Sequence, residues 1–229
     1  AQLALPKPFS AKGRAKGPAK STVDSKAIRR LVRAAMNASR GYEYGGSAAI
    51  TDSLEEVLAL AQRALEGDDG ASALTIIEEI GDNIIPGWEQ YDDDDGGFDD
   101  FFSKLGAIVT EALLTADLSP AERKAWAERV EMWQDQLTDY GLDTGFGAAI
   151  AAAREGWDDP QLQRKLAGLW SESDEDAFED NDADGEWFEE DDGWADLLTA
   201  RLNVLERQGR DEEFLHLALA EAEDLRYTT

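Results

Sequence analysis

Apolar side chains recur through most of this chain at steps of three and four residues, a spacing that gathers them on one face of an α-helix. The clearest case follows Ser119, a good N-cap residue, with Pro120 at the first helical position and Glu122 placed to complete a capping box. The apolar residues at helical spacing after this cap are Trp126, Val130, Trp133, Leu137 and Tyr140. Gly141 then supplies a left-handed stop, so the pattern predicts a long helix from Ser119 to Tyr140.

Other amphipathic stripes follow the same spacing. They lie within residues 28–36, 54–65, 74–91, 98–112, 146–157, 162–170, 194–205 and 214–225. Ser53 and Glu56 match a capping box at the start of the second stripe, and Pro86 is expected to interrupt the third. Asp159 and Pro160 form a cap and first turn before the sixth. In the last stripe we expect burial of Phe214, Leu215, Ala218, Leu219, Ala222 and Leu225.

Short turns join these helices into antiparallel hairpins that begin near residues 52, 98, 145 and 194. The separations of 46, 47 and 49 residues are near those of HEAT and armadillo repeats and exceed those of tetratricopeptide repeats. No β-branched runs indicate strands. We therefore predict an all-α fold for residues 23–229, built of stacked antiparallel helical hairpins as a HEAT/TPR-like α-solenoid or an irregular helical bundle.

The composition fits a packed domain without disulfides. Of the 229 residues, 42% are hydrophobic, and seven Trp, eight Phe and five Tyr can fill a core. There is no Cys, which excludes disulfides, thiol nucleophiles and thiolate metal sites. No apolar run approaches the roughly 18 residues that a membrane span needs, and no signal-peptide pattern is visible. We expect a cytoplasmic protein with no membrane contact.

Charge is distributed very unevenly along the chain, whose formal net charge is −28. Residues 1–40 contain ten Lys and Arg and a single acid, whereas the rest contains twelve Lys and Arg and 49 acids. This asymmetry predicts a basic arm joined to an acidic body, with acidic loops near residues 92–100 and 172–192. Such a body repels phosphate backbones and favours a basic protein partner.

Residues 1–22 are rich in Lys, Ala, Gly and Pro and have no helical periodicity, so we interpret them as a flexible basic linker or tail. An alternative function is contact with nucleic acid, confined to residues 1–40. It would use cations of the arm, which are Lys7, Lys12, Arg14, Lys16 and Lys20.

Catalytic candidates are scarce. The only histidine, His216, stands between two leucines of the last predicted helix, where a structural role is usual. Nucleotide-binding, hydrolase and metalloprotease motifs are absent from the sequence. A hydrolase hidden among the carboxylates would need two of them converging in a cleft with raised pKa values. We therefore expect a non-enzymatic protein.

One acidic segment resembles a calcium-binding loop. Carboxylates at the first, third, fifth and twelfth positions with glycine at the sixth match the EF-hand pattern, although the twelfth is an aspartate. The candidate ligands are Asp180, Asp182, Asp184 and Asp191, with Gly185 at the turn. However, 13 of the 23 residues from 171 to 193 are acidic, so chance matches are easy. The alternative is an acidic loop in which Trp187, Phe188 and Trp194 dock on the core.

Seven short segments of the chain carry a family resemblance. They are residues 101–105, 111–114, 116–123, 133–137, 139–141, 156–157 and 201–210. Together they resemble the helical region that follows the finger in bacterial SWIM zinc-finger proteins. The resemblance implies that residues 23–229 are the C-terminal helical part of a longer protein and that residues 1–22 are its linker. The cysteine ligands of the finger are missing, so zinc binding is not implied. Protein–protein interaction is the function that the resemblance suggests.

These observations lead to one expected function and two alternatives. We expect a non-enzymatic module that binds a basic protein partner through its acidic loops and the groove between stacked hairpins. The first alternative is a calcium-binding helical domain that uses the 180–191 loop. The second is a nucleic-acid-associated protein that acts through its N-terminal arm.

Overall fold

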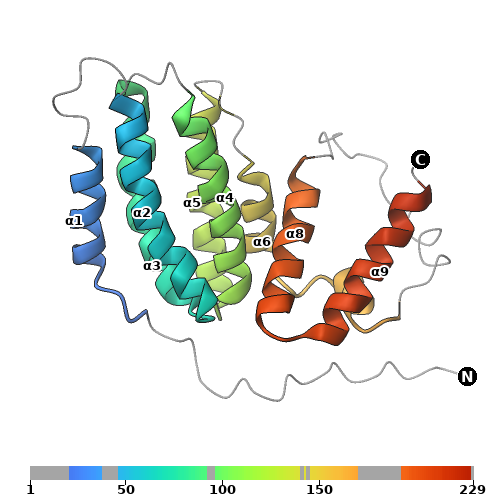
Figure 1. Cartoon of the computed structure of the whole chain (residues 1–229). Helices are drawn as coiled ribbons and strands as arrows, with labels where there is room; N and C mark the ends of the chain where they lie inside the picture. Colours follow the sequence, from blue (N-terminus) through green and yellow to red (C-terminus); the bar gives the residue numbers. More distant parts are fainter. Residues whose placement is uncertain are drawn as a thin grey trace, which may run out of the picture.

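The computed structural model describes residues 21–37, 46–91, 96–139, 142, 145–169 and 192–227. Within these ranges every regular element is a helix, which confirms the predicted all-α class (Figure 1). The elements are α1 (Ser25–Met36), α2 (Gly46–Glu66), α3 (Gly70–Ile84), the 3₁₀ helix η1 (Ile85–Gln90), α4 (Gly97–Thr115), α5 (Pro120–Thr138), α6 (Gly147–Arg154), α7 (Pro160–Leu166), α8 (Asp192–Arg207) and α9 (Asp211–Tyr227).

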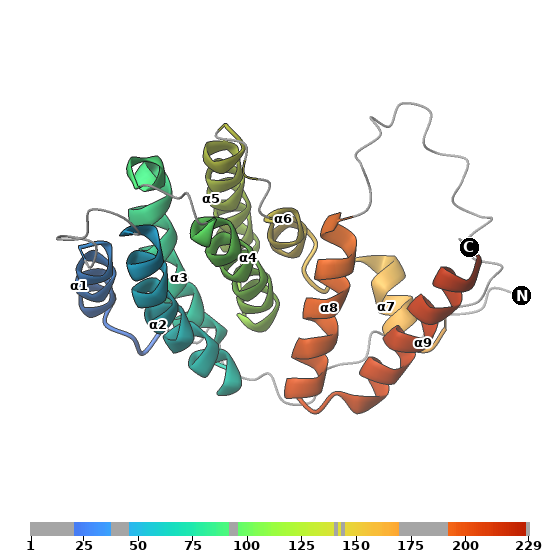
Figure 2. The ribbon, with the colours of Figure 1, turned by 45° about the horizontal axis from the view of Figure 1, so that its top comes forward.

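The helices form an extended array with α1 at one end and α9 at the other (Figures 1 and 2). Helix α4 lies at its centre and packs against α2, α3, α6 and α8. One continuous core runs from α1 to α6 and includes the side of α8 that faces them. A second, small cluster joins α7, α8 and α9 through the buried side chains of Leu162, Leu166, Leu205 and Leu217.

Helix α5 begins as its sequence predicts. The Ser119 hydroxyl accepts a hydrogen bond from the Glu122 backbone N–H at 3.3 Å, and the Glu122 carboxylate accepts one from the Ser119 backbone N–H at 2.8 Å. Pro120 occupies the first turn, and Trp126, Val130, Trp133 and Leu137 are buried on one face. Tyr140 and Gly141, the predicted end of this helix, lie outside the described residues.

The predicted capping box at the start of α2 is wrong. The helix begins at Gly46, and the Ser53 hydroxyl instead donates a hydrogen bond of 2.8 Å to the Ala49 carbonyl one turn earlier. Serine within a helix commonly makes this backward bond, so the motif alone does not mark a first turn. Ile50 is fully buried, and its packing stabilises the additional N-terminal turns.

Pro86 interrupts the third predicted helix as expected. Helix α3 ends at Ile84, and the chain continues as η1, whose residue Gly87 leaves helical geometry. Proline lacks the N–H that an α-helix would use here, and its ring opposes a continued helix. The resulting change of direction places Trp88 against Phe98 and Phe102 at the start of α4.

The helix predicted through Trp157 is shorter than its apolar stripe. Helix α6 ends at Arg154, and Gly156 adopts a left-handed conformation with φ of 57°. This turn brings the Trp157 indole N–H to the Leu114 carbonyl at the end of α4, at 2.8 Å. Trp157 therefore lies outside the helix and is held by this tertiary contact, although its spacing suggested a helical position. Asp159 and Pro160 then start α7 as predicted.

The buried face of α9 is also different from the prediction. Leu217 and Ala220 are buried, whereas Leu215 and Leu219 are 55% and 54% exposed. Apolar residues occupy two sides of this helix, so periodicity alone did not identify the packed side. Contact with α7 and α8 determines which side is covered.

The described part of the chain contains no helix that is long and apolar enough to cross a membrane. Ser21 and Thr22 are the only described residues of the predicted linker. The Thr22 backbone N–H donates a hydrogen bond of 3.1 Å to the Ser72 hydroxyl in α3. The flexibility of the rest of residues 1–22 stays a prediction.

Candidate interaction surfaces

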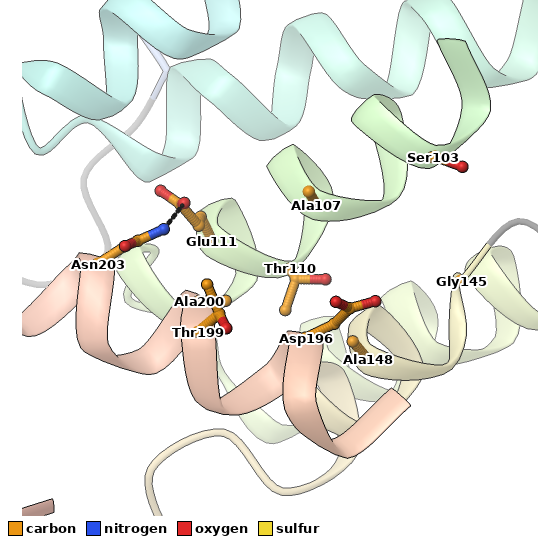
Figure 3. A pocket seen from close by; sticks show the side chains of 10 residues that line it. All are labelled: Ser103, Ala107, Thr110, Glu111, Gly145, Ala148, Asp196, Thr199, Ala200 and Asn203. Carbon is orange, nitrogen blue, oxygen red and sulfur yellow. Dashed lines mark hydrogen bonds between the residues drawn. The ribbon is translucent and has the colours of Figure 1, made fainter. Parts of the chain in front are cut away.

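A hollow of about 400 Å³ lies where α4, α6 and α8 meet (Figure 3). Helices α4 and α8 form its walls, and the start of α6 closes one end. Most of its lining is small, which lets the backbone of another chain approach closely. The lining residues are Ser103, Ala107, Thr110, Glu111, Gly145, Ala148, Asp196, Thr199, Ala200 and Asn203.

One end of this groove is held by a network around Glu111. Its carboxylate accepts hydrogen bonds from Asn203 at 2.9 Å and from Arg207 at 2.7 Å, both on α8. Arg207 also donates to the Thr115 hydroxyl at 3.2 Å. The Glu111 and Arg207 side chains are only 19% and 20% exposed. Charge is balanced here, and the network joins α8 to α4.

The other end carries a carboxylate that has no such partner. Asp196 projects from α8 toward Gly145 and Ala148 at the start of α6 (Figure 3). It is exposed and forms no ion pair with any residue that the structure describes. Helix α6 has no side-chain cap, so its N-terminal amides contribute a favourable partial charge. Asp196 is therefore an exposed acidic group on the groove wall.

A second hollow of about 580 Å³ lies between α5 and α6. Its charges are largely paired with one another: Arg154 contacts Glu131 at 2.6 Å, and Arg123 contacts Asp158 at 3.3 Å. A partner would have to compete with these pairs. The α4/α6/α8 groove, with Asp196 unpaired, is the better candidate for binding.

The predicted acidic and metal-binding elements fall mostly outside the described residues. Asp180, Asp182, Asp184 and Asp191 all do, as do residues 92–95 and 172–191 of the predicted acidic loops. The described remainder of the first loop includes Asp99 and Asp100 in the opening turn of α4. Among the residues that the structure describes, no group of three His, Asp or Glu side chains is arranged to hold a metal ion. Calcium binding by the 180–191 loop stays a prediction.

His216 packs between helices. Its Nδ1 lies 3.0 Å from the Leu166 carbonyl at the end of α7, to which an Nδ1–H can donate. The ring rests against Gly168, where φ is 65° and an added Cβ would collide with the imidazole. This contact joins α9 to the C-terminal turn of α7.

The basic segment is described only from Ser21 onward, so Lys7, Lys12, Arg14, Lys16 and Lys20 lie outside the described residues. On α1, Arg29 forms a two-pronged pair with the buried Glu79 carboxylate, at 2.7 and 2.8 Å. These hydrogen bonds raise the pKa of Arg29 above its ordinary value. Lys26, Arg30 and Arg33 are exposed on the outer side of the helix.

Among the cations of α7 to α9 whose side chains the structure describes, Arg201 is the most buried. Burial lowers its pKa, and the nearby Glu155 carboxylate, 3.5 Å away, opposes that effect. Its guanidinium also donates to the Gly156 carbonyl at 3.3 Å. Arg201 thus joins α8 to the turn after α6.

The sequence did not indicate Glu111, Asp196 or Asn203 as site residues. Glu111 and Asn203 are 92 positions apart, and only the packing of α8 on α4 brings them together. A usable signal was the polar residue Glu111 inside the apolar 98–112 stripe, because buried or half-buried charges need partners.

Comparison of the chain with protein-family models, with curated proteins and with solved structures finds no match.

Proposed function

We propose that this chain is a non-enzymatic, acidic helical module that binds a basic segment of a protein partner in the α4/α6/α8 groove. The observation that carries the proposal is the unpaired Asp196 carboxylate beside a hollow lined mainly by small side chains. A Lys or Arg of the partner would pair with Asp196, while its backbone would lie along Ala107, Thr199 and Ala200.

The electrostatics of the whole chain support a basic partner. A net charge of −28 attracts basic segments and accelerates their encounter with the surface. The local groove then provides selection, since a paired charge and close backbone contact need matching geometry. Glu111 supports the groove structurally, because Asn203 and Arg207 already occupy its carboxylate.

The arrangement of carboxylates supports binding over hydrolysis. Glu111 forms an ion pair with Arg207, and Asp196 is exposed to solvent. A hydrolytic pair would need one carboxyl with its pKa raised by burial or by a neighbouring negative charge. Glu111 instead faces the cation of Arg207, and Asp196 lies exposed at the other end of the groove.

Site-specific photo-crosslinking tests the proposal. The photoreactive residue p-benzoylphenylalanine would replace Ala107, which is exposed in the groove, and Met132 on α5 as the matched control. Both proteins would be irradiated in nuclease-treated lysate of the source organism. We expect a discrete protein adduct from position 107 and none of that mass from position 132.

A second variant tests the charge. Asp196→Lys should reduce the position-107 adduct about tenfold, equivalent to ~1.4 kcal/mol of binding free energy. Asp135→Lys, at an exposed acid of α5, should leave it within about twofold because that residue does not line the groove. Equal adducts at positions 107 and 132, or an adduct unchanged by Asp196→Lys, would refute groove binding.

A further inference from the structure

The last helix of the array presents an uncovered apolar face. Leu215 and Leu219 are 55% and 54% exposed, and Ala222 continues the same side one turn later. No residue that the structure describes packs over them. Asp211 and Glu212, in the first turn of α9, border this face and form no ion pair within the described ranges. We call these five residues the α9 face.

The first helix presents a face of opposite charge. Lys26, Arg30 and Arg33 are exposed on the outer side of α1 and have no acidic partner among the described residues. Ala34 lies next to Arg30 on this helix, and Leu31, which is 47% exposed, borders Ala34. Arg33 is two positions from Leu31 and therefore points away from it. We call Arg30, Leu31 and Ala34 the α1 face. Among the described residues it combines an exposed apolar edge with a cation that has no acidic partner, in a chain that is otherwise strongly acidic.

The two faces lie at opposite ends of the array (Figures 1 and 2). Stacked-helix proteins bury each helix pair against the next, so an uncovered apolar end is an incomplete stack. The α1 face can complete the α9 face of another copy, because it offers both a leucine and the opposite charge. Pairing two α9 faces would instead bring the acids of two acidic molecules together.

We propose that this protein associates head to tail, with the α1 face of one copy seated on the α9 face of the next. Leu31 and Ala34 contact Leu215 and Leu219, and Arg30 approaches Asp211 and Glu212. Two different patches form this contact. After each copy is added, one α1 face and one α9 face remain free at the two ends of the assembly, which therefore grows as an open chain.

The strength of the contact follows from its size. One helix on another buries less than the roughly 1,200 Å² of a stable interface, so association is weak and concentration-dependent. The high net charge opposes it at long range. At about 0.15 M salt, charges more than about 8 Å apart are screened, which leaves the local attraction between the faces. Association is therefore expected at that salt, and it should increase with protein concentration.

Two end-blocked variants of the full chain test this geometry. The α9-blocked variant carries Leu215→Gln and Leu219→Gln, and the α1-blocked variant carries Arg30→Glu and Leu31→Gln. All four positions are exposed, so both variants should fold, as circular dichroism would verify. Met132→Gln and Arg63→Glu, at exposed sites elsewhere, are the matched controls. All proteins are measured with and without nuclease treatment and are checked for nucleic acid by absorbance.

Sedimentation equilibrium at 0.15 M salt then gives the masses. We expect the parent and both controls to exceed the monomer mass of 25.1 kDa increasingly with concentration. Each blocked variant alone should remain monomeric. An equimolar mixture of the two should form a dimer and no larger species, because it contains one intact α1 face and one intact α9 face for every pair.

Other outcomes overturn the proposal in distinguishable ways. A parent that stays monomeric at millimolar concentration, or a mixture that does, removes head-to-tail association. Continued dimerisation of the α1-blocked variant alone indicates pairing of α9 faces. Association that disappears with nuclease assigns Arg30 to phosphate binding. None of these residues lines the α4/α6/α8 groove, so the result is independent of the proposed partner site.

Discussion

The helices from α1 to α6 and the C-terminal helices α7 to α9 are stabilised by different means. The first region has a continuous core with large, fully buried aromatic side chains, among them Trp133, Phe98 and Phe146. The second has four buried leucines and relies in addition on polar links such as Lys165–Glu221 at 3.0 Å. Burial of apolar area dominates stability. The C-terminal region buries less of it, so this region should have the smaller free energy of unfolding.

Helix α8 connects the two regions. Leu197, Ala200 and Val204 belong to the main core, while Leu205 belongs to the leucine cluster. The C-terminal helices therefore depend on a helix that the first region holds in place. The difference suggests that α7 and α9 can open locally while the first region stays folded, as weakly packed units of proteins do.

The largest expected effect is in the aromatic core. Trp133 is fully buried, stacks edge-on with Trp126 and Phe146, and donates to Asp82 at 3.2 Å. Trp133→Ala should lower the free energy of unfolding by about 3–5 kcal/mol through lost burial and the resulting cavity. Urea denaturation followed by far-ultraviolet circular dichroism measures this. Trp194→Ala, at a side chain that is 45% exposed, is the control and should cost less than about 1 kcal/mol.

A smaller and local effect is expected in the leucine cluster. Leu217→Ala should destabilise α7 and α9 by about 2–3 kcal/mol because it empties the centre of a small core. Hydrogen exchange should accelerate in α7 and α9 and remain unchanged in α2 to α5. The exposed Leu219→Ala is the matched control. Equal acceleration throughout the chain would mean that the two regions unfold as one cooperative unit.

The smallest effect concerns the cap of α5. Hydrogen bonds from the Ser119 hydroxyl and backbone N–H lower the pKa of Glu122 below its ordinary value. The stabilisation by this carboxylate is therefore present above the unfolded pKa of about 4.3 and is lost as pH falls through the lower folded value. Ser119→Ala should raise the pKa of Glu122, as NMR titration would show. Ser53→Ala should leave it unchanged, because Ser53 bonds within α2.

Helix starts and breaks were predictable from the sequence where the residues that determine them are close together in the chain. The α5 cap spans only Ser119 to Glu122, and the break at Pro86 follows from the proline itself. Asp159 and Pro160 started α7 for the same reason. Such features need no tertiary information, since backbone geometry and neighbouring side chains determine them.

Features decided by distant contacts were not predictable in this way. The buried side of α9 depends on α7 and α8, and the sequence spacing fitted its exposed leucines equally well. The extra turns of α2 depend on the burial of Ile50. The candidate groove needs α8 packed against α4, although almost a hundred residues separate the parts that meet there.

The fluorescence of Trp157 can report whether the C-terminal helices are packed against the rest of the protein. Its indole N–H bonds the Leu114 carbonyl at 2.8 Å, and the Arg210 guanidinium carbon lies 4.8 Å from the ring centre. The ring also packs against both the main core and the leucine cluster. In a protein whose other tryptophans are replaced by phenylalanine, its fluorescence would shift to the red when the C-terminal helices separate and water reaches the ring. Emission from this one residue would then follow the docking equilibrium in real time.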